Sequence, residues 1–294
     1  VPFPYLDETI LLNEQTREGL PGSFIALPSG VTHYEEGGDP NGQPIVLVHG
    51  FSVPYFIYDP TFEFLSAQGF RVLRYDLIGR GFSDRPAVRY NAKLFVRQLK
   101  ELLDALNFKN ISLVGLSMGG VVTASFIDAH PVYVSRYILI DPLGAKAVSL
   151  SPFLKAVKMP GFGELAIGLF GSDSMIKGAA SDLFTPELVQ LFQEKYKVQM
   201  QYQGFKRAIL STVRSGMLGS FIEVYARLGQ LKKPTLLLWG RQDKTVPFKY
   251  SQDILSVMPQ IQFNVIENCG HLPHYEKPAE VNPILLEFLQ RKIT

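Results

Sequence analysis

The sequence predicts an α/β fold in which a mostly parallel central sheet has helices on both faces and an inserted helical cap. Short apolar runs alternate with segments of helical periodicity over the first half of the chain, which is typical of parallel sheets. The alternation stops after Leu143 and resumes at Thr235. An interval of about ninety residues is too long for a loop of a compact domain. We therefore expect a core domain of residues 1–142 and 231–294 and a cap domain of residues 143–230.

Six apolar runs predict buried strands, because each is short and bounded by turn-forming residues. They cover residues 44–48, 71–75, 111–114, 137–140, 234–240 and 261–266. Apolar residues at helical spacing predict a core helix over residues 91–106, and further helices are expected over residues 62–68 in the core and over residues 186–202 and 205–218 in the cap. Glycines and Pro160 are expected to interrupt the earlier part of the cap. The first thirty residues carry no clear pattern.

Composition excludes several classes of protein. The 294 residues are 46% hydrophobic, enough for a large core, and the net charge of +2 with no long basic run gives no support for nucleic-acid binding. A single cysteine, Cys269, rules out an internal disulfide and is compatible with the cytoplasm. No apolar run is long enough for a membrane span. No signal peptide is visible, but the chain begins at Val1, so a processed or secreted form stays open, as does contact with a lipid interface.

The most informative stretch is Gly115-Leu116-Ser117-Met118-Gly119, which lies between a predicted strand and an apolar helical segment. In this arrangement the serine occupies a sharp turn and its hydroxyl stands clear of the backbone. The flanking glycines suit the turn because a side chain there would collide with the strand or the helix. A serine hydroxyl is a weak nucleophile, so this interpretation also requires a base and an orienting acid.

Both further groups follow in the chain at the ends of predicted strands. Asp243 comes after residues 234–240, and His271 comes after residues 261–266. Ser117, Asp243 and His271 are thus expected at one edge of the sheet, where sites of open α/β sheets lie. Two rivals are weighed: Asp141 also ends a strand and competes for the acid, and His274 competes for the base. We favour Asp243 and His271.

At this point the chain resembles a serine α/β-hydrolase of the capped carboxylesterase or monoacylglycerol lipase type. The resemblance is carried by four segments, which are residues 49–51, 76–83, 115–120 and the Asp243 and His271 loops. It implies the α/β-hydrolase fold and an oxyanion hole formed by the backbone N–H groups of Phe51 and Met118. It also implies ester hydrolysis through an acyl-enzyme, with no cofactor, on a small-molecule ester.

Other residues receive lesser roles. Phe56 is expected to line the substrate pocket, and His49 is expected to hold its turn by hydrogen bonds rather than to react. Arg80 is expected to be solvated or salt-bridged rather than to touch substrate, and Cys269 to be a small packing residue. The histidines and the cysteine show no zinc-type spacing, so no metal site is expected. The cap is rich in leucine, phenylalanine, methionine and isoleucine, which favours an apolar acyl chain.

Two alternatives stay open on the same scaffold, and two more belong to other classes of protein. Carbon–carbon bond hydrolases of aromatic degradation usually carry Asn before the serine and Trp after the histidine, where this chain has Leu116 and Leu272. Cofactor-free perhydrolases resemble the elbow around Ser117 closely. A ligand receptor with slow turnover belongs to a different class, as does a purely structural interaction domain. Acyl-chain length, stereoselectivity, cap mobility and oligomeric state do not follow from the sequence.

Overall fold

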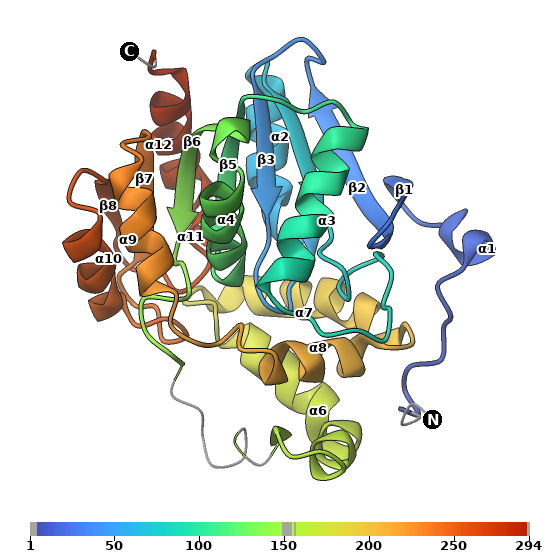
Figure 1. Cartoon of the computed structure of the whole chain (residues 1–294). Helices are drawn as coiled ribbons and strands as arrows, with labels where there is room; N and C mark the ends of the chain where they lie inside the picture. The colour runs from blue at the N-terminus through green and yellow to red at the C-terminus, as the bar shows by residue number, and fades with distance from the viewer. Residues whose placement is uncertain (1–4, 149–154, 156, 293–294) are drawn as a thin grey trace.

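A computed structural model describes residues 5–148, 155 and 157–292. Its centre is an eight-stranded sheet in the order β1-β2-β4-β3-β5-β6-β7-β8 (Figure 1). The strands from β4 to β8 in this order pair in parallel, and β1 and β2 form an antiparallel edge. The mostly parallel α/β fold predicted from the sequence is confirmed. The strands are β1 (Ser23–Leu27), β2 (Gly30–Gly38), β3 (Pro44–Val48), β4 (Arg71–Tyr75), β5 (Ile111–Leu116), β6 (Val134–Ile140), β7 (Thr235–Gly240) and β8 (Gln262–Ile266).

The antiparallel hairpin of β1 and β2 is not among the predicted strands. Its first strand is an edge strand in which no residue is fully buried, so it needs no continuous apolar run. The six predicted strands are all present. The central ones, β3, β5 and β7, are almost wholly buried because helices cover both faces of the sheet.

Helices bury each face of the sheet in its own apolar cluster. One face packs against α3 (Ala92–Ala105), α4 (Met118–Ala129), α9 (Ile222–Gln230) and α10 (Ser251–Val257). The other packs against α2 (Asp59–Ala67), α11 (Pro273–Glu276) and α12 (Pro278–Gln290). Asn91 caps the start of α3 by accepting a hydrogen bond from the amide of Leu94. Short helices complete the core: α1 (Glu14–Arg17), η1 (Tyr55–Tyr58), η2 (Pro131–Tyr133) and η5 (Phe248–Tyr250).

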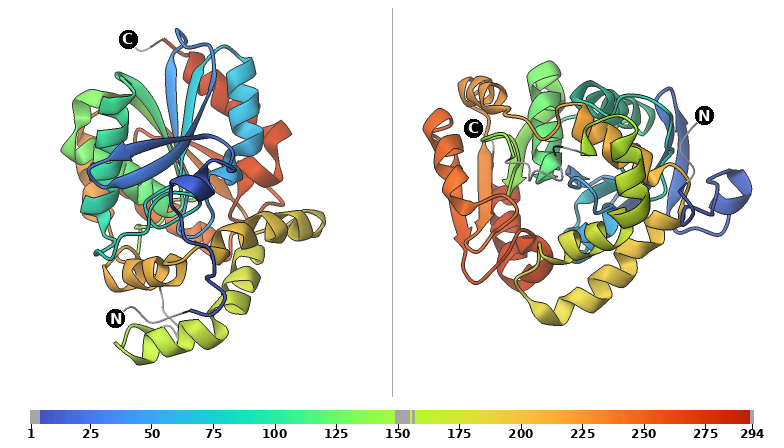
Figure 2. Two further views of the ribbon diagram at one scale, coloured as in Figure 1. Left: turned by 90° about the vertical axis from the view of Figure 1, so that its right-hand side faces the viewer. Right: turned by 90° about the horizontal axis from the view of Figure 1, so that it is seen from below.

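The chain between β6 and β7 carries α6 (Phe162–Ala180), α7 (Val189–Val198) and α8 (Phe205–Arg214), with η3 (Pro186–Leu188) and η4 (Gln199–Gln201) between them. We call these the inserted helices. They lie across the end of the molecule toward which the parallel strands point, as Figures 1 and 2 show. The next helix, α9, packs instead against α4 and α10 beside the sheet. We therefore propose that the cap predicted for residues 143–230 ends before α9.

The expected interruption of the early cap is present at Pro160 and Gly161, which lie in the turn before α6, but it is wrong for the later glycines, because α6 runs unbroken for 19 residues. Two of its glycines, Gly163 and Gly171, sit where the chain packs closely. A Cβ on Gly163 would overlap the carbonyl oxygen of Val157, and one on Gly171 would lie 2.6 Å from Ile167. Glycine here allows close packing rather than ending the helix. None of the helices in the described part of the chain is long and apolar enough to cross a membrane.

Residues 5–12, the N-terminal segment, join the inserted helices to the core. Asp7 forms an ion pair of 2.6 Å with the buried Lys206 of α8, and Glu8 accepts hydrogen bonds from the amides of Gly204 and Lys206 at 2.6 Å each. Ile10 pairs with Tyr202 as an isolated bridge. The segment therefore caps the start of α8 and holds it by several polar contacts.

Candidate active site

Ser117 lies on a tight turn between β5 and α4. Its backbone has φ 53° and ψ −119°, a strained combination for a residue with a side chain. Three backbone hydrogen bonds hold it there: its amide donates to Ile140, and its carbonyl accepts from Gly120 and Leu143. The glycines of the motif have a steric reason as well, because a Cβ on Gly119 would overlap the carbonyl oxygen of Val48. The turn therefore needs both the strain and the glycines.

The loop after β3, residues 49–51, packs against Ser117. A Cβ placed on Gly50 would lie 3.2 Å from the Cβ of Ser117, so the backbone of residues 49–51 runs directly past the serine. The amides of Phe51 and Met118 donate no hydrogen bond to any other described residue. Met118 is also the first residue of α4, where the helix dipole favours negative charge. These two amides are free to bind an oxyanion.

Asp243 and His271 form a hydrogen-bonded pair. Nδ1 of His271 lies 2.7 Å from Oδ2 of Asp243, and the other carboxylate oxygen accepts from the amides of Thr245 and Val246 at 2.8 Å each. Nε2 of His271 makes no hydrogen bond with the described residues. Burial alone would lower the pKa of His271, but the charge and hydrogen bond of Asp243, with smaller contributions from Asp182 and Glu276, raise it above its ordinary value. An ionised partner on Nδ1 and a free Nε2 are what a general base requires.

The rival acid, Asp141, occupies a different place. It is fully buried, and one of its oxygens accepts from the amide of Gly240 at 2.9 Å. Burial raises the pKa of Asp141 well above its usual range, and the neighbouring charge of Asp243 adds to the effect. The raised pKa favours the neutral form of Asp141, and it is Asp243 that contacts His271.

The rival base and the turn histidine are both buried and neutral. His274 packs its ring 4.7 Å from that of Tyr58, and burial lowers the pKa of His274 to about 3. His49 receives a hydrogen bond from Leu77 on Nε2 and lies 3.0 Å from the carbonyl of Gly50 through Nδ1. Burial lowers the pKa of His49 to about 4. His49 thus links the 49–51 loop to Leu77, the residue after Asp76.

Arg80 is neither solvated nor salt-bridged, so that expectation is wrong. Its side chain is fully buried. Nε donates to the carbonyl oxygen of Phe51 at 2.6 Å, and an Nη donates to Thr212 of α8 at 2.8 Å. No carboxylate of the described residues pairs with it. Although burial lowers the pKa of Arg80 to about 10, the guanidinium stays charged near neutral pH.

The turn after β4 is organised by Asp76. This buried carboxylate accepts from the amides of Tyr55 and Phe82 at 2.9 Å each and from Nδ1 of His33 at 2.8 Å. A Cβ on Gly81 would overlap the same carboxylate. The 76–83 segment is thereby held in place next to the 49–51 loop, which it contacts through Leu77 and Arg80.

Three site-supporting residues have no recognisable sequence pattern. Gln199 of η4 bridges two loops, donating to the carbonyl of Ser52 at 2.6 Å and accepting from the amide of Gly81 at 2.9 Å. Glu276 of α11 accepts from three backbone amides of the His271 loop and the inserted helices. Asp182, which follows α6, receives the amide N–H of His271 on its carbonyl oxygen at 2.8 Å. Each is a single polar residue, so only the tertiary structure reveals its partner.

Phe56 connects the core to the inserted helices. It is buried, its ring lies edge-on to Phe192 of α7 at 5.9 Å, and the Nζ of Lys195 lies 5.6 Å from the ring centre. Leu116 and Leu272, which flank the candidate nucleophile and base in sequence, are buried in the same apolar cluster as Phe56. The surroundings of Leu116 and Leu272 are accordingly apolar.

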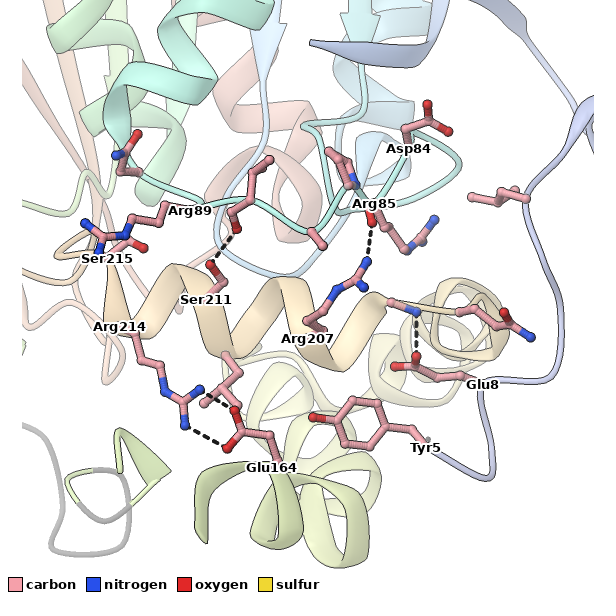
Figure 3. Close-up of a pocket in the computed structure, with 18 of the residues that line it drawn as sticks. Tyr5, Glu8, Asp84, Arg85, Arg89, Glu164, Arg207, Ser211, Arg214 and Ser215 are labelled. Atoms are coloured by element: carbon pink, nitrogen blue, oxygen red, sulfur yellow. Dashed lines mark hydrogen bonds and ion pairs between the residues drawn. The ribbon is translucent and has the colours of Figure 1, made fainter. Parts of the chain in front are cut away.

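A separate cavity of about 1620 Å³ lies along α8, between the N-terminal segment and residues 84–91 (Figure 3). None of Ser117, Asp243 and His271 lines it. Several of its charged groups already have partners: Arg214 pairs with Glu164 of α6, and Glu8 caps α8. We assign no part of the reaction to this cavity.

Only one group of described residues brings three potential metal ligands within 4.8 Å of one another, namely Asp141, Asp243 and His271. His271 and Asp243 in this group lie 2.7 Å apart through a hydrogen bond, which needs its proton. The nitrogen of His271 and the oxygen of Asp243 are committed to one another, and we propose no metal there.

The chain has many relatives. Residues 45–284 match the model of the alpha/beta hydrolase family. The 2-hydroxy-6-oxo-6-phenylhexa-2,4-dienoate hydrolase of Comamonas testosteroni is 30% identical, over 90% of this chain and 93% of the relative. A thermophilic esterase from Thermogutta terrifontis superposes with a TM-score of 0.75 at 25% identity, covering 92% of this chain and 98% of that one. A meta-cleavage product hydrolase from Pseudomonas fluorescens gives 0.74 at 26% identity, covering 91% and 97%. The chain belongs to the alpha/beta hydrolase family.

Proposed function

We propose that this hydrolase cleaves carboxylic esters with an apolar acyl chain through an acyl-enzyme on Ser117. The observation that carries the proposal is the pair formed by His271 and Asp243, which leaves Nε2 of His271 free at the sheet edge where Ser117 lies on its strained turn. A nucleophile, a base and an orienting acid in this chain order are the parts of an acyl-transfer site.

Each residue has one task in the reaction. Ser117 attacks the ester carbonyl while Nε2 of His271 takes its proton. The negative charge that develops on the carbonyl oxygen is held by the amides of Phe51 and Met118. The alcohol leaves with the proton from His271, and water repeats the steps to release the acid. Asp243 stays ionised, fixes the imidazole with its proton on Nδ1 and stabilises the imidazolium.

The apolar surroundings support an apolar acyl group. Phe56, Leu116 and Leu272 are buried together in one cluster that extends into the inserted helices. We propose that Phe56 contacts the substrate from the core side and that the inserted helices act as the cap over it. An uncharged acyl chain suits such a surface because burying a charged one would leave it without partners.

A second candidate is hydrolysis of a carbon–carbon bond in a 2-hydroxy-6-oxo-dienoate. The similarity to the Comamonas testosteroni hydrolase favours it. The buried Leu116 and Leu272 favour the ester, because the carbon–carbon hydrolases that the chain resembles usually have Asn and Trp at these places. Both reactions use the same serine, histidine and aspartate, so the substrate alone separates them.

The test is a series of p-nitrophenyl esters from acetate to palmitate, run beside 2-hydroxy-6-oxo-6-phenylhexa-2,4-dienoate. We expect multiple turnover on an ester and a loss of about 10⁴ to 10⁶-fold in Ser117→Ala. The exposed Ser256→Ala serves as the matched control and keeps wild-type turnover. Faster turnover of the dienoate than of every ester would replace the first proposal by the second. No turnover of either by the folded protein would reject both.

A further inference from the structure

The inserted helices reach the candidate base through residues 182–185, which follow α6. The carbonyl oxygen of Asp182 accepts the amide N–H of His271 at 2.8 Å. The 182–185 segment and the His271 loop approach so closely that a Cβ on Gly270 would overlap this same carbonyl oxygen and would lie 2.9 Å from the amide of Phe184. Glycine at position 270 therefore has a specific reason, because it lets residues 182–185 seat directly on the His271 loop.

Glu276 forms hydrogen bonds with both the 182–185 segment and the His271 loop. One carboxylate oxygen accepts from the amides of Phe184 and Thr185 at 2.7 and 2.9 Å, and the other accepts from the amide of Gly270 at 2.9 Å. A single carboxylate thereby bridges the inserted helices and the loop of the base. Charge-assisted bonds of this kind are among the stronger ones in proteins.

The side chain of Asp182 extends the contact to the loop of the acid. It accepts a hydrogen bond from the hydroxyl of Thr245. The amide of Thr245 in turn donates to Asp243 at 2.8 Å. Asp182 thus contacts the loops of both His271 and Asp243, although it lies on neither.

We infer that Asp182 is a second positioning carboxylate for His271, supplied by the inserted helices, so that the base is fully formed only while residues 182–185 are seated on its loop. This inference rests on the proposed roles of Ser117, Asp243 and His271. Under this inference, residues 182–185 are part of the reacting site and not only a cover over it.

The charges around the imidazole agree with this role. Several titratable groups face His271. Asp243 comes from the loop after β7, Asp182 comes from residues 182–185, and Glu276 and His274 come from α11. The neutral form of Asp141 is favoured by burial and by the neighbouring charge of Asp243. The anionic groups Asp243, Asp182 and Glu276 favour the imidazolium and raise the pKa of His271, against the effect of its burial. Burial raises the pKa of Asp182 to about 6, and the positive charge of His271 opposes that rise.

The inference is tested by following the histidine ring signals of the whole protein by NMR as a function of pH, with the His271 signal assigned through His271→Gln. Asp182→Asn removes the charge and keeps an oxygen for Thr245 and the backbone carbonyl for His271. We expect the pKa of His271 to fall by on the order of one pH unit in this variant. Asp173→Asn, an exposed position on α6, is the matched control and leaves the pKa of His271 unchanged.

Thr245→Val is the second variant, and it keeps the test decisive if Asp182→Asn does not fold. It releases the carboxylate of Asp182 without removing any charge, so we expect a smaller fall in the pKa of His271. Wild-type titration of His271 in both folded variants would overturn the inference, as would the same titration in Thr245→Val when Asp182→Asn is unfolded. Because NMR reads the base directly, absence of ester hydrolysis would reject the proposed function and leave this result standing.

Discussion

The buried guanidinium of Arg80 donates a hydrogen bond of 2.6 Å from Nε to the carbonyl oxygen of Phe51. The amide of the same residue is one of the two proposed oxyanion donors. Arg80 also holds Thr212 of α8 at 2.8 Å, so one side chain joins the oxyanion loop to the inserted helices. This bond fixes the position of residue 51, and with it the preceding peptide group that carries the Phe51 N–H, which makes Arg80 a positioning residue for the proposed reaction.

Arg80→Met should therefore lower kcat by about 10 to 100-fold, because the backbone of residue 51 loses its anchor at the carbonyl and small displacements of the adjoining N–H donor are costly. The measurement is kcat on the best p-nitrophenyl ester, with urea unfolding to show that the variant is folded. Arg89→Met, at an exposed position, is the control and keeps wild-type kcat. A folded Arg80→Met with wild-type kcat would remove Arg80 from the site.

The two neighbouring aspartates should respond very differently to amide substitution. Asp243→Asn removes the ionised partner of His271 and favours the wrong tautomer, so kcat should fall by about 10⁴-fold, as in other triads. Asp141→Asn replaces a carboxyl group whose neutral form is favoured with a neutral amide of the same shape and keeps an acceptor for Gly240. We expect nearly unchanged kcat from Asp141→Asn. If steady-state kinetics showed the opposite order, Asp141 would be the orienting acid.

The pH dependence of kcat/KM should report the state of His271. The base acts only when neutral, and its pKa is raised above the ordinary value of 6.5. Activity should therefore be lost as the pH falls through that raised pKa, with the midpoint of the acid limb above pH 6.5. Initial rates at low substrate concentration between pH 5 and 9 measure it. A midpoint below pH 6.5 would mean that burial outweighs the surrounding carboxylates.

Two glycine-to-alanine changes should have effects of opposite sign on stability. Gly119→Ala forces a methyl group into the carbonyl oxygen of Val48 and should lower the free energy of unfolding by about 1–3 kcal/mol. Gly178 lies in α6, and a Cβ there would meet no atom within 4 Å, so Gly178→Ala should raise the free energy of unfolding by about 0.5–1 kcal/mol. Urea unfolding followed by the fluorescence of the one tryptophan, Trp239, measures both. Equal stability of the two variants would contradict the close approach of β3 and α4.

The sequence predicts the parallel part of the sheet because each central strand is buried on both sides and must be apolar throughout. It predicts the places of Ser117, Asp243 and His271 for a related reason: each follows such a strand, and parallel strands end at one edge. Asp243 and His271 lie 2.7 Å apart although 28 positions separate them. These features depend on local pattern and on strand order, both of which a single sequence carries.

Arg80, Asp182 and Glu276 are different, because their positions depend on contacts across the fold. Arg80 looks like a surface residue in sequence, and its acceptors lie 29 and 132 positions away. The hairpin of β1 and β2 escapes prediction since a half-exposed edge strand needs no apolar run. The unbroken α6 escapes it because close packing, as at Gly163, allows glycine inside a helix that single-residue propensity would interrupt.

The N-terminal segment has a consequence for how the chain folds during synthesis. Glu8 caps α8 through Gly204, and 196 positions separate these two residues. At ribosomal speeds of about 5–20 residues per second, residues 5–12 therefore wait roughly 10–40 seconds for their partners. During that interval the buried partner of Asp7, Lys206, has not yet been made, and the segment is open to proteases and chaperones. Closure of this long loop is thus a late event, and the helices over the site take their final place after most of the core has been translated.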